Sequence, residues 1–135
     1  MSGTENTESQ VIEPLAKFHV KVYGNGNRFV LPEPTRIRYR IREGYFIEVI
    51  IRTIEIESGA ILERAYFIPK VSTNGVITIP KGLVKELNIQ RGDVLEVVLL
   101  NYFSLRRLAR GASKLKMPVK GYVILEPNEE QQLLK

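Results

Sequence analysis

The sequence predicts a mainly β domain with short helices, built from two tandem β-β-α-β repeats. At 135 residues, 44% of them hydrophobic, the chain is long enough for one ordinary packed domain. Short β-branched runs alternate with turns rich in glycine and asparagine, as in β proteins. The third observation is an internal repeat with a single offset of 48 residues, seen in the pairs Pro32 and Pro80, Ile41 and Ile89, Gly44 and Gly92, Glu48 and Glu96, Val49 and Val97.

Each repeat has the same order of elements. It opens with a short strand at Lys21-Val22 or Lys70-Val71. The stretches YGNGNR and STNGV follow as turns, because Gly and Asn adopt the positive φ that a tight reversal needs. FVLP and ITIP are short apolar strands that end in Pro, which suits the first turn of a helix. KGLVKELNI has the apolar spacing of a short helix, and YFIEVIIR and VLEVVLL are then the closing strands.

The segment TRIRYRIREGY, residues 35–45, allows two interpretations. Its strict alternation of arginine with apolar residues is typical of a half-buried strand. The repeat instead aligns it with the helix of the second copy, with Tyr39 and Ile41 at apolar positions of that helix. Pro34 is tolerated in the first turn of a helix and not in a central strand. We therefore favour a short helix over 34–39.

This helix would gather positive charge on the surface. Arg36 and Arg40 lie four residues apart and would share one face, with Arg38 to the side. We expect Tyr39 to be buried, and Arg36 and Arg40 to be exposed.

The remaining segments join and close the repeats. Residues 46–57 and 60–68 are expected to pair across a hairpin turn at Ser58-Gly59. After the second repeat, a weak helical face carries arginines on its other side, and GYVILE is a closing strand. The predicted organisation is a flexible acidic N-terminus (1–14), repeat one (15–57), a hairpin linker (58–69), repeat two (70–102), a basic helix or loop with the closing strand (103–126), and a frayed or weakly helical tail (127–135).

Composition favours a polyanion as partner. The net charge is +5, and the positive charge is concentrated in residues 14–52 and in residues 101–124, where six bases occur without an acid. Such blocks suggest nucleic acid, although a solvated surface on a stable protein would look the same. The N-terminus has no signal-peptide pattern and VLEVVLL is too short to span a bilayer, so we expect a cytoplasmic protein without a membrane partner.

The sequence argues against an enzyme. It has no cysteine and one histidine, His19, so we expect neither a metal site nor a cofactor. The dinucleotide-binding fingerprint is incomplete because Phe29 stands where a third glycine is needed, and no Walker loop is present. Glu48 and Glu96 could face each other as a carboxylate pair, but strand carboxylates are more often solvent-facing or salt-bridged.

The repeat unit resembles the AbrB/MazE/SpoVT family of swapped-hairpin, or looped-hinge, DNA-binding domains. The resemblance covers about residues 18–52 and 67–102, and KVSTNGVITIPKGLVKELNIQRGDVLEVV is the closer copy. It implies that two copies interleave their hairpins into one small β-barrel, here within a single chain as in MraZ-like members. It also implies duplex DNA as partner and a possible homo-oligomer. Only about ten residues follow GYVILE, which argues against the toxin-wrapping tail of family antitoxins.

The resemblance and the charge pattern together indicate the candidate DNA-binding residues. Lys21 and Lys70 match the family's basic position on the first strand, and Arg28 matches its arginine after the turn, where repeat two has Val76. The candidates are Lys21, Arg28, Arg36, Arg38, Arg40, Lys70, Lys81, Lys85, Arg106, Arg107 and Arg110. The predicted function is a transcriptional regulator that binds duplex DNA mainly through phosphate contacts. The alternative is a non-enzymatic interaction or scaffold module that binds protein or structured RNA.

Overall fold

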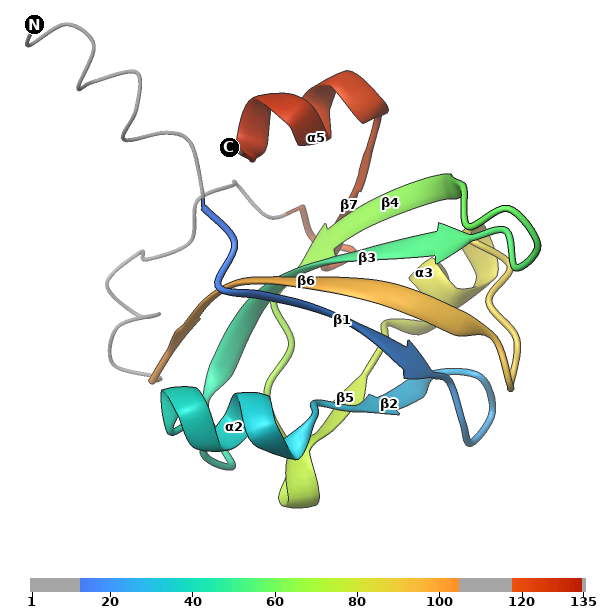
Figure 1. The fold of residues 1–135 in the computed structure, drawn as a ribbon. Helices are drawn as coiled ribbons and strands as arrows, with labels where there is room; N and C mark the ends of the chain where they lie inside the picture. Colours follow the sequence, from blue (N-terminus) through green and yellow to red (C-terminus); the bar gives the residue numbers. More distant parts are fainter. Residues whose placement is uncertain (1–12, 105–117, 135) are drawn as a thin grey trace, which may run out of the picture.

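A computed structural model describes residues 13–104 and 118–134 (Figure 1). Arg106, Arg107 and Arg110, the helix predicted around them, and most of the acidic N-terminus lie outside these ranges. The elements are β1 (Ala16–Lys21), β2 (Arg28–Val30), α2 (Glu33–Tyr39), β3 (Phe46–Ile54), β4 (Ile61–Phe67), η1 (Thr73–Gly75), β5 (Val76–Thr78), α3 (Lys81–Glu86), β6 (Val94–Phe103), β7 (Tyr122–Leu125) and α5 (Pro127–Leu133). The mainly β class with short helices is confirmed.

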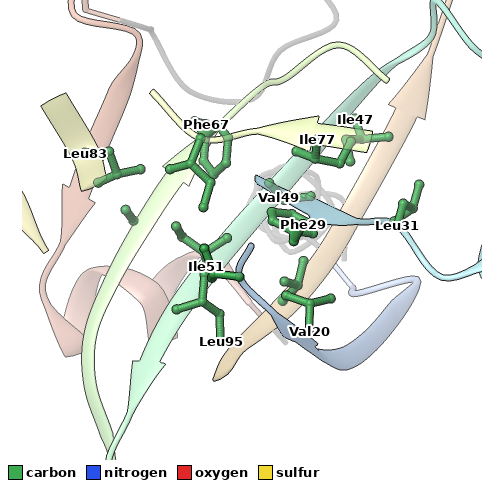
Figure 2. Close-up of a cluster of buried hydrophobic side chains, with 14 of the residues drawn as sticks. Val20, Phe29, Leu31, Ile47, Val49, Ile51, Phe67, Ile77, Leu83 and Leu95 are labelled. Atoms are coloured by element: carbon green, nitrogen blue, oxygen red, sulfur yellow. The ribbon is translucent and has the colours of Figure 1, made fainter. Parts of the chain in front are cut away.

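The strands form two antiparallel sheets that enclose the main core. One sheet has five strands in the order β1-β6-β3-β4-β7, and the other is the two-stranded ribbon β2-β5. Figure 2 shows how side chains of the ribbon, among them Phe29 and Ile77, lie against Val49 and Ile51 of β3. All four of these side chains are fully buried. The ribbon is thus held to the larger sheet by apolar burial, which contributes roughly 25 cal/mol per Å².

Strand pairing brings together residues that are 48 positions apart in the sequence. In the ribbon, Phe29 is paired with Ile77. In the large sheet, Ile50 of β3 is paired with Val98 of β6. Farther from these two pairs, equivalent residues form equivalent pairs: Lys21 pairs with Val94, and Lys70 pairs with Phe46.

Backbone conformation repeats at the same offset. Arg40 and Asn88, shortly after the two helices, adopt the left-handed region, with φ values of 55° and 54°. Gly44 and Gly92 follow with φ values of 93° and 92°. Local backbone geometry is thus similar at these positions 48 residues apart.

The described strands do not form the predicted barrel. The five-stranded sheet is open, and among these strands the ribbon pairs only within itself. Each ribbon strand has three residues and is followed within two positions by Pro32 or Pro80, which lack a backbone donor. The ribbon therefore covers the sheet by side-chain packing without extending its hydrogen-bonded ladder.

Helix α2 confirms the helical interpretation of the arginine segment. The burial of Tyr39 and Arg36 and the position of Arg40 differ from the prediction. Tyr39 is half-buried, and its hydroxyl donates a hydrogen bond of 2.8 Å to the backbone oxygen of Leu15. Arg40 has left the helix, so it does not share a helical face with Arg36. Arg36 is half-buried instead of exposed.

The C-terminal residues are a packed helix where we expected a frayed or weakly helical tail. In α5, Glu130 and Leu133 are buried, and a capping box between Glu126 and Glu129 closes its first turn. The predicted hairpin between residues 46–57 and 60–68 is confirmed by the pairing of β3 with β4, and the closing strand is confirmed as β7. Within the described ranges, no helix is long and apolar enough to cross a membrane.

Candidate nucleic-acid interface

The outer face of the β2-β5 ribbon presents Arg28. Its neighbour Phe29 is fully buried, so strand alternation directs Arg28 outward, opposite the exposed Thr78. The guanidinium carbon of Arg28 lies 5.9 Å from the centre of the exposed Tyr23 ring, within cation–π range. At the equivalent place in repeat two, Val76 supplies no charge.

Lys21 and Lys70 occupy equivalent places but not the ribbon face. Both are exposed, Lys21 at the end of β1 and Lys70 after β4. Val20 and Val22, on either side of Lys21, belong to the main core. Strand alternation therefore directs Lys21 away from that core, toward the side of the sheet opposite the ribbon.

Arg36 is bound into the structure. Its Nε donates a hydrogen bond of 2.9 Å to the backbone oxygen of Leu31. Its side chain also covers Gly75, where an added Cβ would lie 2.5 Å from that nitrogen. The turn of repeat two is thus packed against the helix of repeat one. The prediction that Arg36 is a freely exposed arginine is wrong.

The two helices carry the remaining candidate cations. Arg38 and Arg40 are exposed, and Arg38 lies 5.5 Å from the centre of the Tyr39 ring. Lys81 and Lys85 are exposed on α3. The helix of repeat one therefore offers guanidinium groups where that of repeat two offers ammonium groups.

Glu86, the acidic residue of α3, accepts a hydrogen bond within the fold. The Tyr122 hydroxyl donates a hydrogen bond of 2.8 Å to Glu86. This bond raises the pKa of Tyr122, and burial adds to the rise. Lys120 lies 4.6 Å from the centre of the same ring.

The loop after each helix adds an arginine that the sequence analysis did not select. These are Arg42 and Arg91, and both are exposed. The backbone nitrogen of Arg91 lies against Gly26, 3.1 Å from the position of an added Cβ there. The aligned stretches IREG and IQRG each contain a base, a signal that could have identified them.

Arg52, at the end of the first positive block, and Arg64, between the two blocks, are both paired with carboxylates. Arg52 donates hydrogen bonds of 2.7 Å to Glu130 and 2.8 Å to Glu96, and Arg64 donates one of 2.8 Å to Glu130. Burial would lower the pKa of Arg52, but its hydrogen bonds to Glu130 and Glu96 outweigh that effect and raise the pKa above its usual value. This network ties α5 to the outer face of the large sheet.

Glu48 and Glu96 do not face each other. Glu96 is opposite Arg52 in the register, whereas Glu48 is opposite Asn101. Buried Glu48 accepts a hydrogen bond from the Tyr66 hydroxyl. This arrangement matches the salt-bridged alternative for Glu96. In the part of the chain that the structure covers, no group of three or more potential metal ligands gathers.

The two repeats thus define a β-rich unit with basic residues on the ribbon and on both helices, and comparisons place this unit among known proteins. The family described as "Antidote-toxin recognition MazE, bacterial antitoxin" matches residues 68–101. The chain is also similar to the solution structure of PHS018 from Pyrococcus horikoshii, with a TM-score of 0.60 and 35% sequence identity over 69% of this chain and 97% of that chain. No curated protein matches it. The chain belongs to the same family as PHS018, and its residues 68–101 are similar to the MazE antitoxin family.

Proposed function

We propose that the chain is a DNA-binding regulator in which two MazE/AbrB-like repeats pair as an internal pseudo-dimer. The observation that carries this proposal is the pairing of Phe29 with Ile77 and of Ile50 with Val98. In a twofold assembly, residues on the axis meet their own counterparts. Pairing at the repeat offset in both sheets supports such an axis through the ribbon and the large sheet, and it supports an interleaved, swapped-hairpin arrangement of the repeats.

Duplex DNA would lie across the end of this axis, over the ribbon and the flanking helices. Arg28 on the ribbon, Arg38 on α2, and Lys81 and Lys85 on α3 are exposed and could contact phosphates. Arginine binds phosphate or guanine bidentately, whereas lysine supplies a point charge. Repeat one would therefore contribute more of the geometry and repeat two mostly charge, so the preferred site need not be palindromic.

The test is a titration of duplex DNA at several salt concentrations. One variant carries Arg28→Ala with Arg38→Ala, and its counterpart carries Lys81→Ala with Lys85→Ala. Each lost phosphate contact should reduce the slope of log affinity against log salt by about 0.9, so each variant should lose roughly 2 in slope. The arginine variant should lose more affinity than the lysine variant.

The matched control is Lys17→Ala. Lys17 is exposed on β1, and its neighbours Ala16 and Phe18 pack against the main core, so it is directed away from the ribbon. It removes a positive charge outside the proposed surface and should leave the salt slope nearly unchanged. Wild-type protein without salt-dependent DNA binding would reject the proposal and favour a module that binds protein or structured RNA. A control that loses as much as either variant would indicate binding through net charge alone.

A further inference from the structure

A groove lies between the tip of the β3-β4 hairpin and the end of α3. It has a volume of about 300 Å³. Its lining residues are Thr53, Ile54, Ile56, Leu62, Glu63, Leu87, Asn88, Asp93, Val94 and Leu95. Ile56 is 75% exposed and Leu62 is 58% exposed, which is unusual for large aliphatic side chains.

The charged residues that line the groove have one sign. Glu63 and Asp93 are its charged lining residues, and no lysine or arginine lines it. Glu55 and Glu57 add two exposed carboxylates at the hairpin tip. Asp93 also accepts a hydrogen bond of 2.9 Å from the backbone of Gln90, which fixes its position. The groove is thus apolar with an acidic rim.

Two aromatic side chains lie at the equivalent place in repeat one. There, Tyr39 and Tyr102 pack with ring centres 5.7 Å apart. The offset of 48 places Leu87 at the position of Tyr39, and the strand register places Thr53 at that of Tyr102. Repeat two therefore has smaller side chains, Leu87 and Thr53, at the two positions where repeat one has tyrosines.

Helix α2 carries a surface complementary to this groove. Ile37 is 68% exposed and belongs to neither apolar cluster of the described part of the chain. The exposed Arg38 lies beside it, and the exposed Arg40 follows at the helix end. An exposed aliphatic side chain among cations matches an apolar groove with an acidic rim.

We propose that this groove binds α2 of a second copy of the chain. Ile37 enters the groove against Ile56 and Leu62, and Arg38 and Arg40 approach Glu63 and the hairpin carboxylates. The hairpin tip and α2 lie at opposite ends of the molecule (Figure 1). The contact is therefore head-to-tail, and unless it closes into a ring it continues from copy to copy. The interface is small, so we expect association only at high protein concentration.

The test uses sedimentation velocity on the purified chain without nucleic acid. One variant, Ile37→Asp, disables the helix surface, and the other, Leu62→Arg, disables the groove. Both positions are exposed, so we expect folding to be retained, with circular dichroism as the check. Wild type should form species larger than dimers as concentration rises, whereas each variant alone should remain monomeric.

Mixing the two variants gives the decisive result. Each supplies one intact surface, so the mixture should form dimers and nothing larger. Val119→Asp, at a fully exposed position outside both surfaces, is the matched control and should associate like wild type. A wild type that stays monomeric at every concentration would overturn the proposal, as would a mixture that remains monomeric. Because the measurement omits DNA, its failure leaves the proposed DNA binding untouched.

Discussion

Replacement of Gly75 by alanine tests how the turn of repeat two is packed on the helix of repeat one. Gly75 has a φ of +80°, and an added Cβ would lie 2.5 Å from Nε of Arg36. Gly59 has a nearly equal φ of +75°, but nothing lies within 4 Å of an added Cβ there. Substitution by alanine should therefore cost the same backbone free energy at both glycines. Only at Gly75 would the added Cβ also clash with Arg36.

The expected magnitudes follow from that difference. Alanine in the left-handed region costs about 1–2 kcal/mol, which is the whole effect expected for Gly59→Ala. Gly75→Ala must also displace Arg36 and weaken its hydrogen bond to Leu31. A hydrogen bond of a charged group contributes about 1.5–3 kcal/mol, and half-burial of Arg36 favours the lower end. We expect Gly75→Ala to lower the free energy of unfolding by about 2–4 kcal/mol.

Urea denaturation of single and double variants separates the two terms. In an Arg36→Ala background, the cost of Gly75→Ala should fall to that of Gly59→Ala, since the clashing side chain is gone. The m-value should stay constant, so that shifts in midpoint report stability. Equal costs for the two glycines, or a Gly75→Ala cost that ignores the residue at position 36, would refute the packing argument.

Three further changes test other contacts. Glu130→Gln should lower the free energy of unfolding by about 3–5 kcal/mol in urea denaturation, because it leaves buried Arg52 and half-buried Arg64 poorly paired, whereas exposed Glu57→Gln should change it by under about 0.5 kcal/mol. Tyr39→Phe should cost about 0.5–1.5 kcal/mol in the same assay through loss of one hydrogen bond, and an unchanged midpoint would contradict that bond. The raised pKa of Tyr122 means that its bond to Glu86 stabilises the fold below about pH 10 and that this contribution disappears as pH rises through the folded-state pKa. Melting temperatures measured from pH 8 to 11 should therefore fall less steeply in Tyr122→Phe than in wild type, and parallel curves would exclude this contribution.

Much of the secondary structure was predictable because two stretches of the sequence match at an offset of 48 residues and could be compared. A single copy of TRIRYRIREGY reads as a strand, and only alignment with the second copy indicates the helix that the structure contains. The turn glycines were predictable for the same reason, since positive φ is required at both places. Barrel closure was not predictable, because it depends on whether a three-residue ribbon strand reaches a neighbouring edge.

The surface was less predictable than the fold. Arg52 and Arg36 look like neighbouring cations in one positive block, yet one is buried in a carboxylate network and the other covers a glycine of the opposite repeat. Charge counts cannot separate such residues from exposed ones, because Gly75, which Arg36 covers, and Glu96 and Glu130, which pair with Arg52, are far away in the sequence. The packing of α5 was not predicted because NEEQQLLK contains only two apolar residues, which give a weak helical periodicity. The pairing of Glu130 with Arg52 and Arg64 leaves no signal in the local sequence.

The pairing of β2 with β5 inside one polypeptide has a consequence for dilution. When two separate chains supply such strands, the ribbon dissociates as the protein becomes scarce. Here the segments are covalently joined, and tethered partners meet at effective concentrations on the order of millimolar, whatever the number of molecules present. Ribbon formation should thus be first-order and independent of abundance. The tether also allows the two strands to differ in sequence, as at Arg28 and Val76, without producing a mixture of mismatched assemblies.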